Sequence, residues 1–309
     1  MTSDSIATAI LELTKACNEH CPFCYSLSYS PRNADPSKSR LGVLSGDEWT
    51  QTLDNIAQAG TTAVDFSGGE PTLHPAFPRI LAYAKAQGLY TIVSTNGSRV
   101  DDASTRDAIA TAADCVALSI HGSTARSHDA VKGKAGAYDR AMQAYAWVAG
   151  MTPVHVKVNT VACQQNLTDI DTLGNLLGIE RNRTVWKISQ AIPREAGKLH
   201  KDLVAISDDA FNDLQVRIIA KCPRAYAEGR VVFREDDTAT QQYSPYVIVR
   251  CDGEVFVPSG ENHKSLGVNA RTPGAFTALG SAIERILETP YERFADDLRS
   301  THERSYRTP

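Results

Sequence analysis

The chain has 309 residues, of which 42% are hydrophobic and 22% charged, enough for one large folded core with a smaller appended region. Its formal net charge of −4 and pI near 6.1 give no basic excess, so nucleic acid is not expected as a partner. No apolar run approaches the ~18 residues that cross a bilayer, and the N-terminus lacks a secretory pattern, so we expect a cytoplasmic protein without membrane contact.

Apolar β-type runs alternate with helical-period segments over the first two-thirds of the chain, which predicts βα units and a parallel sheet. Six units are too few to close an eight-stranded barrel, so the predicted fold is α/β, a partial (β/α)6 TIM-like barrel. Ser45 and Glu48 are expected to form a capping box. The predicted strands are residues 7–13, 63–67, 90–94, 115–119, 154–160 and 185–189, and the predicted helices are residues 45–58, 76–87, 102–113, 137–148 and 167–177.

The pattern changes after residue 192, which we take as a domain boundary. Residues 1–192 are expected to form the barrel core, and residues 193–309 a small α+β extension that covers the substrate. Asp252-Gly253 is a dipeptide typical of tight hairpin turns. The elements predicted here are a helix over residues 208–220, a β-hairpin over residues 246–250 and 255–257, and helices over residues 275–287 and 291–299.

Three cysteines with the spacing C-x3-C-x2-C, namely Cys17, Cys21 and Cys24, follow the first predicted strand. Thiolates are the usual ligands of iron–sulfur clusters, and three of them leave one iron of a [4Fe–4S] cluster open to a small molecule. Disulfides are not expected, because the seven cysteines are an odd number without a secretory signal. A structural zinc site with His20 as the fourth ligand remains an alternative.

Polar residues stand at the end of each predicted strand of the core. Parallel βα folds assemble their chemistry at the carboxyl ends of the strands, so we expect these residues to converge. They are Gly68, Gly69 and Glu70 after the second strand, Ser94 and Asn96 at the third, Ser119 and His121 at the fourth, Lys157 and Asn159 on the fifth, and Ser189 on the sixth.

The cysteine triplet and the run Ser67-Gly68-Gly69-Glu70-Pro71 one βα unit later together resemble the radical S-adenosylmethionine (SAM) superfamily, over about residues 8–189. The resemblance implies that Cys17, Cys21 and Cys24 hold a [4Fe–4S] cluster whose open iron binds SAM. It also implies reductive cleavage of SAM to methionine and a 5′-deoxyadenosyl radical, which abstracts a substrate hydrogen. A flavodoxin or ferredoxin is the electron donor expected for such an enzyme.

The same resemblance suggests which residues bind SAM. Glycines let a backbone approach a ligand closely, so Gly68-Gly69, with Glu70 as an acceptor, would contact the SAM amino group. Phe23 would pack on the adenine, or else be an ordinary buried aromatic, and Asn96 is also a common turn former. The predicted SAM-binding residues are Phe23, Tyr25, Gly68, Gly69, Glu70, Ser94, Asn96, Ser119, Asn159 and Ser189.

Two further residues are candidates for substrate contact. His121 stands where many relatives carry an acidic residue, and it would bind substrate, shuttle a proton, or serve as a satisfied structural histidine. Lys157 alternates with Asn159 on one face of its strand, which would point both into the barrel mouth.

Four cysteines lie outside the triplet, and Cys115 is expected to pack as a small apolar residue. Residues 247–267 resemble a shortened SPASM/twitch-like accessory region, a region that normally carries auxiliary clusters. Pro258-Ser259 stands where such a region has a cysteine, which puts a second [4Fe–4S] cluster in doubt. Cys163 and Cys222 are its candidate ligands.

The late cysteine, Cys251, is our candidate hydrogen-atom donor, with cluster ligand and inert core thiol as alternatives. Radical epimerases of the neomycin C epimerase type, which this chain resembles in size and cysteine placement, use such a thiol. The first hypothesis is therefore an epimerase of antibiotic biosynthesis, acting on an aminoglycoside amino sugar or a residue of a small peptide. The alternative is a radical SAM oxidoreductase or peptide-crosslinking maturase with an auxiliary cluster. A non-catalytic metal-binding protein would not need the polar strand ends.

Overall fold

The protein is described by a computed structural model that covers residues 8–24, 42–193, 198, 200–234, 246–259 and 262–276. The strands in this part of the chain are β1 (Thr8–Glu12), β2 (Ala63–Ser67), β3 (Tyr90–Thr95), β4 (Cys115–Ser119), β5 (His155–Ala162), β6 (Val185–Gln190), β7 (Val231–Arg234), β8 (Val247–Val249), β9 (Glu254–Ser259) and β10 (Asn262–Asn269). The helices are α1 (Gly46–Gln58), η1 (Pro71–Leu73), α2 (Phe77–Ala86), α3 (Ala103–Ala112), α4 (Ala125–Lys132), α5 (Ala137–Ala149), α6 (Ile170–Leu176), α8 (Lys201–Val204), α9 (Asp208–Lys221) and α10 (Pro223–Ala227).

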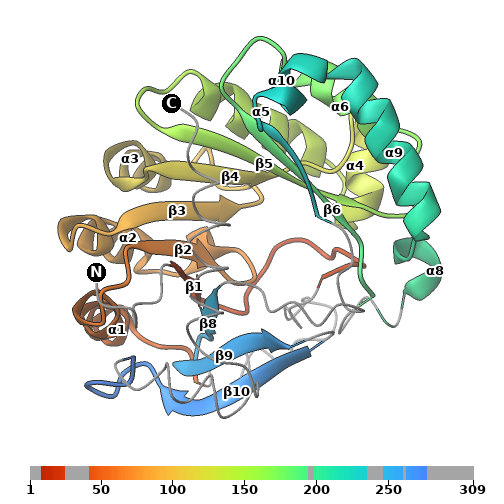
Figure 1. Ribbon diagram of the computed structural model, residues 1–309. Helices are drawn as coiled ribbons and strands as arrows, with labels where there is room; N and C mark the ends of the chain where they lie inside the picture. Colours follow the sequence, from red (N-terminus) through yellow and green to blue (C-terminus); the bar gives the residue numbers. More distant parts are fainter. Residues whose placement is uncertain are drawn as a thin grey trace.

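One curved sheet organises the described residues, with the strand order β10-β9-β8-β1-β2-β3-β4-β5-β6-β7. The pairs from β8–β1 through β6–β7 are parallel, whereas β8–β9 and β9–β10 are antiparallel. Figure 1 shows the helices around the outside of the sheet and the β9–β10 hairpin, in blue, at its lower edge. The expected open, partial barrel with a C-terminal hairpin is thus confirmed.

The sheet is longer than the six predicted strands. β7 (Val231–Arg234) lies beyond the proposed boundary at residue 192, yet it continues the barrel sheet beside β6. β8 comes from the C-terminal region and pairs with β1, placing Ala9 opposite Val247. A pairing between the two ends of a chain leaves no local signal in the sequence, so the alternation of strands and helices did not predict it.

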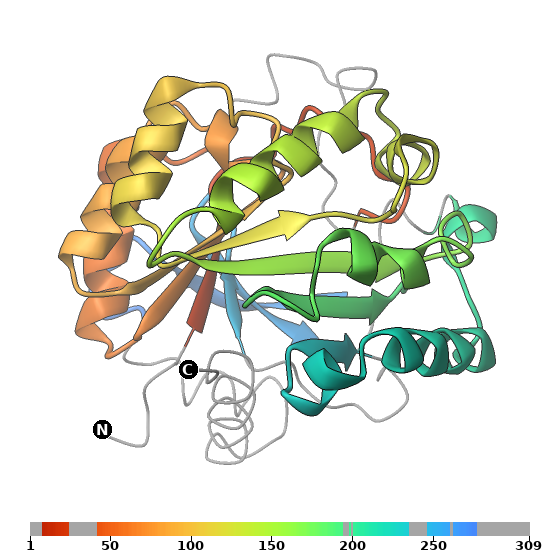
Figure 2. The ribbon, with the colours of Figure 1, turned by 90° about the horizontal axis from the view of Figure 1, so that it is seen from above.

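Side-chain alternation gives the sheet an apolar outer face and a polar inner face. In β6, Trp186 and Ile188 are fully buried under the helices, whereas Lys187 and Ser189 are half-buried on the opposite face. Figure 2 shows the helices from above, with α1–α3 along one flank of the curved sheet and α9 along the opposite flank. The inner face is therefore where ligand chemistry can take place.

Helix α4 was not predicted, because it lacks an apolar stripe and its buried side chains include His128 and Lys132. The predicted helix over residues 208–220 corresponds to α9 (Asp208–Lys221). The helices predicted over residues 275–287 and 291–299 lie outside the described residues, apart from residues 275 and 276. Among the described helices, none has the length and apolar character needed to span a membrane.

Helix α1 begins with the predicted capping box. The Glu48 amide donates to Ser45 Oγ at 3.3 Å, and the Ser45 amide donates to Glu48 Oε2 at 2.8 Å. We expect Ser45→Ala to lower the free energy of unfolding by about 1 kcal/mol, because the Glu48 amide loses its acceptor and the Glu48 carboxylate loses the Ser45 hydroxyl as a donor. Urea titration of the cluster-free protein measures this. Ser104→Ala, at an exposed position in α3, is the matched control, and an equal effect of both substitutions would contradict the prediction.

Candidate active site

The three predicted cluster ligands lie on one loop at the carboxyl end of β1. Their thiols are free and half-buried, and the Cys24 amide donates to the Cys21 carbonyl at 3.1 Å. Within the described ranges, no three His, Cys, Asp or Glu side chains are arranged to hold a single metal ion. A [4Fe–4S] cluster makes a different demand, since each thiolate binds its own iron.

Burial disfavours the ionised, thiolate form of these side chains unless a positive group lies beside them. It raises the pKa of Cys17 to about 12, and it raises the pKa of Cys21 further. A bound metal centre supplies the missing positive charge and deprotonates the thiols it binds. Three soft donors on one buried loop therefore fit an iron–sulfur cluster held by Cys17, Cys21 and Cys24.

The loop is docked against the C-terminus of α4. Lys132 Nζ lies 2.8 Å from Glu19 Oε2, and both side chains are 3% exposed. The His20 amide donates to the Lys132 carbonyl at 3.0 Å, and a Cβ on Gly133 would lie 2.5 Å from the His20 carbonyl oxygen. Burial alone would lower the pKa of Lys132. The Cys21 thiolate and the Glu19 carboxylate have the larger combined effect, and the lysine pKa is raised. No pattern in the sequence predicted this contact.

The Gly68-Gly69 segment lies against the chain that enters the cysteine loop, which is a second reason for the two glycines beside the predicted contact with SAM. The Gly69 amide donates to the Thr14 carbonyl at 2.7 Å, and the Glu70 amide donates to the Ala16 carbonyl at 2.8 Å. A Cβ on Gly69 would lie 2.2 Å from the Ala16 oxygen, and one on Gly68, where φ is 135°, 2.5 Å from the Thr14 oxygen. Protein backbone accordingly requires these glycines, whatever ligand also binds there.

Glu70 was predicted as an acceptor for SAM, but its carboxylate is already used by the protein. It accepts from the Thr72 amide at 3.2 Å and hydroxyl at 2.6 Å, from the Thr95 hydroxyl at 2.7 Å and from the Asn96 amide at 2.8 Å. Asn96 in turn donates through Nδ2 to Asn18 Oδ1 at 2.9 Å. Burial raises the pKa of Glu70, and these donors oppose the shift. Glu70 and Asn96 therefore join the loops after β1, β2 and β3.

Other predicted SAM-binding residues lie on the inner face of the sheet. Ser119 stands opposite Asn159 across β4 and β5, and Ser189 stands opposite Val161 across β5 and β6. The Oδ1 atom of Asn159 is buried and has no hydrogen-bond partner among the residues that the structure describes. A buried acceptor without a donor is costly, so it fits a ligand hydroxyl or amine at this position. Ser94 instead forms a hydrogen bond with Asp65.

The inner face also carries a group of charges that our sequence interpretation largely missed. Burial raises the pKa of Asp65 to about 6, although Ser94 and Lys157 counteract it. Burial and the nearby Lys157 and Arg234 lower the pKa of Lys187 well below its ordinary value. The sequence held a usable signal, because period-2 alternation places Lys187 on the same face as Ser189.

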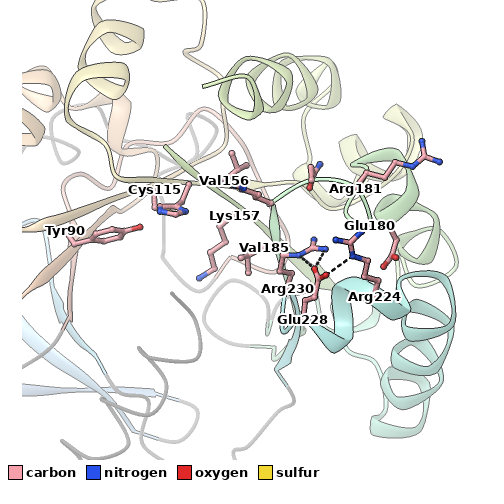
Figure 3. A pocket seen from close by; sticks show the side chains of 13 residues that line it. Tyr90, Cys115, Val156, Lys157, Glu180, Arg181, Val185, Arg224, Glu228 and Arg230 are labelled. Carbon is pink, nitrogen blue, oxygen red and sulfur yellow. Dashed lines mark hydrogen bonds and ion pairs between the residues drawn. The ribbon is translucent and has the colours of Figure 1, made fainter. Parts of the chain in front are cut away.

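We predicted that Lys157 points into the mouth of the barrel, where the cysteine loop lies. It lies instead nearer the opposite end of the barrel. It lines a cavity of 540 Å³ at the amino ends of the strands, together with Tyr90 and Cys115 (Figure 3). On the far wall Glu228 pairs with both Arg224 and Arg230, each at 2.7 Å. Cys115 packs with Ile92 and Ala117, as expected of an apolar residue. Residues lining the cavity are Tyr90, Cys115, His155, Val156, Lys157, Glu180, Arg181, Asn182, Arg183, Val185, Arg224, Glu228 and Arg230.

His121 is held as a neutral ring at the end of β4. Its Nδ1 accepts from the Val161 amide at 3.1 Å, and its own amide donates to His128 Nδ1 at 3.1 Å. Burial, with Lys132 and His128 nearby, lowers the pKa of His121 well below its ordinary value. Phe23 packs edge-on against its ring at 5.0 Å. His121 therefore supports the cysteine loop through Phe23 and does not gain a proton near neutral pH. Tyr25, also predicted to bind SAM, lies outside the described residues.

The late cysteines lie apart from one another. Cys222 is buried in the helical layer, where a Cβ on Gly174 would lie 2.7 Å from its sulfur, whereas Cys163 packs with Phe23. The structure therefore does not bring these candidate ligands of a second cluster together. Cys251 follows β8, which runs parallel to β1, so it lies at the same end of the sheet as the triplet. Its thiol is buried, and burial raises its pKa to about 11.

An open parallel barrel with a cysteine triplet after β1 and a Gly-Gly-Glu loop after β2 defines a class of cluster-dependent SAM enzymes. The chain belongs to the Radical SAM superfamily, whose sequence pattern matches residues 11–177. Members of this family use a [4Fe–4S] cluster and SAM, so both predicted cofactors are confirmed. When bound, they supply a 5′-deoxyadenosyl radical that abstracts hydrogen from a substrate.

Several proteins are similar in sequence to about half of the chain. The mycofactocin maturase MftC of Mycobacterium tuberculosis is 33% identical over 166 residues, 53% of this chain and 40% of MftC. A PqqA peptide cyclase of Rhizobium meliloti is 30% identical over 164 residues (53% and 42%), and an AdoMet-dependent heme synthase of Methanosarcina barkeri is 30% identical over 159 residues (52% and 43%). The matches therefore span less than half the length of each relative.

The fold comparison covers more of the chain than the sequence comparison. The crystal structure of Streptococcus suis SuiB superposes with a TM-score of 0.68 over 93% of this chain and 68% of SuiB, at 15% identity. At this identity the similarity concerns the fold alone. It supports the arrangement of strands and helices described above, including the partial barrel.

The close approach of Gly69 to Ala16 leads to a prediction about cluster binding. We expect Gly69→Ala to push the cysteine loop away from β2 and to reduce the iron bound after anaerobic reconstitution to well under half of the wild-type content of about 4 atoms per chain. Iron and sulfide assays measure this. Gly150→Ala, whose Cβ meets its nearest neighbour at 3.5 Å, is the matched control. Wild-type iron content in Gly69→Ala would show that the contact does not hold the loop.

The buried His128 predicts a loss of stability in acid. Burial and the nearby Lys132 lower its pKa to about 3, below the unfolded value near 6.5, so its contribution is complete above pH ~6.5 and is lost as the pH falls toward 3. Below pH ~6 the unfolding free energy of the wild type decreases as the pH falls. We expect His128→Gln to reduce this slope by about 1 kcal/mol per pH unit. Urea titrations of the cluster-free protein between these limits measure the slope.

The exposed His155→Gln is the matched control for removing one histidine. Parallel slopes for His128→Gln and wild type would mean that the folded state accepts a proton on His128 after all.

Proposed function

We propose that this radical SAM enzyme modifies a peptide by abstracting one of its hydrogen atoms, in the manner of a peptide maturase. The observation that carries the proposal is the similarity of its cofactor-binding half to a mycofactocin maturase and a PqqA peptide cyclase. The fold also resembles that of SuiB bound to its precursor peptide SuiA, with a TM-score of 0.66 and 16% identity. These comparisons favour the maturase alternative over the epimerase hypothesis that the cysteine placement had suggested.

The inner face of the barrel has the chemistry that a peptide requires. Asp65 provides a carboxylate, and Lys187 and Arg234 provide nitrogen donors, deep between the strands. Asn159 adds an acceptor without a partner near the carboxyl ends. Amide, amine and carboxylate groups of a peptide can pair with such a mixed set of donors and acceptors. We propose a flavodoxin or ferredoxin as the source of the electron.

Epimerisation remains the second candidate because of one observation, the state of Cys251. A hydrogen-atom donor must keep its hydrogen until the substrate radical forms, and burial raises the pKa of this thiol to about 11, so it stays protonated near neutral pH. Cys251 also lies at the triplet end of the sheet. Its weak S–H bond suits the return of a hydrogen atom to a carbon radical.

The two candidates make opposite predictions for Cys251→Ser. The enzyme is reconstituted anaerobically and incubated with SAM, a reductant and peptides encoded by open reading frames beside its gene, and the products are read by mass spectrometry. For a maturase we expect a peptide that has lost two hydrogen atoms, formed by wild type and Cys251→Ser alike. For an epimerase we expect one solvent deuterium at an inverted carbon in deuterium oxide, and Cys251→Ser should make 5′-deoxyadenosine without inverted product.

Cys222→Ser, in the helical layer, is the control for loss of a buried thiol. If 5′-deoxyadenosine forms in the presence of these peptides and none of them changes in mass, deuterium content or chirality, the peptide proposal is wrong.

A further inference from the structure

The ion pair between Lys132 and Glu19 is unusual for its burial. Both side chains are 3% exposed, whereas every other ion pair among the described residues has at least one partner that is 38% or more exposed. Taking two charges out of water costs several kcal/mol per ion, and their attraction repays this only with good geometry. At 2.8 Å the two atoms are in direct contact. A pair of this kind is a weak source of stability, so its position suggests a different role.

The position is at the cluster site. Glu19 lies between the ligands Cys17 and Cys21, and Lys132 ends α4 on the other side of the contact. The His20 amide donates to the Lys132 carbonyl, so backbone and side chain of Lys132 both hold the same loop. Gly133 adopts a φ of 59°, and any side chain there would collide with His20. The end of α4 is thus shaped to receive the cysteine loop.

The contact lies next to one of the three ligands. His20, whose amide donates to the Lys132 carbonyl, is the residue before Cys21. The Lys132 ammonium contacts Glu19 on the same segment of the loop, so a buried cation lies between the positions of Cys17 and Cys21. Neither charge is screened by solvent, because both lie in the interior.

We propose that Lys132 and Glu19 are a positioning pair for the iron–sulfur cluster: the pair fixes the ligand loop on α4 and places a buried cation beside Cys21 that favours the reduced cluster. Reduction adds an electron, and a fixed positive charge nearby stabilises the more negative state, so it raises the reduction potential. Membership of the Radical SAM superfamily establishes the cluster, so this proposal does not depend on whether the substrate is a peptide.

The test is the midpoint potential of the reconstituted cluster, followed by electron paramagnetic resonance in a redox titration without SAM. We expect Lys132→Met to shift the potential downward, because Glu19 remains as a lone buried anion. Glu19→Gln should shift it upward, and the double variant should lie between the two. Lys221→Met is the matched control, since Asp171 keeps its second partner Arg217, and it should titrate with wild type. Potentials of Lys132→Met and Glu19→Gln that match the control would overturn the electrostatic part of the proposal.

Thermal unfolding of the cluster-free protein tests the positioning part and covers the case in which Lys132→Met takes up no cluster. If the pair holds the loop, the single variants should melt at lower temperature than wild type, and the double variant should recover part of the loss. Additive losses in the double variant would show that the two side chains act separately, and the positioning role would be rejected. Glu19→Gln, nearly identical in shape to the native residue, supplies the potential measurement if Lys132→Met cannot.

Discussion

The site depends on one close backbone approach, between Gly68-Gly69 and the chain that leads from β1 into the cysteine loop. The ladder of β1 and β2 continues past the strand ends through the hydrogen bonds from Gly69 to Thr14 and from Glu70 to Ala16. Any side chain at Gly69 would enter the space of the Ala16 carbonyl. The position of the cluster ligands is therefore set by the rigid sheet, since the loop that carries them is an extension of its central pair of strands.

Much of the polar chemistry around the mouth serves this scaffold. Glu70 and Asn96 form hydrogen bonds with neighbouring loops, and His121 is fixed between Val161 and His128. A carboxylate or imidazole with its partners satisfied holds its neighbours in place, because breaking such a bond in the interior leaves an unpaired polar group. Groups that still need a partner, such as Asn159 Oδ1, are the ones with capacity left for a ligand.

The sequence predicted what short-range patterns can carry. Strand positions, the βα order and the cap at Ser45 follow from residues a few positions apart. The cysteine triplet also predicted its own location, because parallel strands place their carboxyl ends together. The neighbours of Gly68 and Glu70 were not predictable: glycine indicates a close approach without naming what approaches, and a carboxylate does not reveal its donors. Helix α4 was missed because its buried face holds a histidine and a lysine, which a search for apolar periodicity excludes.

The two parts of the chain contribute differently to the barrel interior. The family pattern ends at residue 177, and it contains the cysteine loop, the glycine segment and His121. Lys187, Arg234 and Cys251 come from β6, β7 and the turn after β8, beyond that limit, yet they complete the same sheet. Cofactor binding needs a fixed geometry that enzymes with different substrates can share, whereas the side chains elsewhere in the barrel can differ between them. Relatives as different as peptide maturases and a heme synthase match only about half of this chain in sequence, as expected when the shared part is the one that binds the common cofactors.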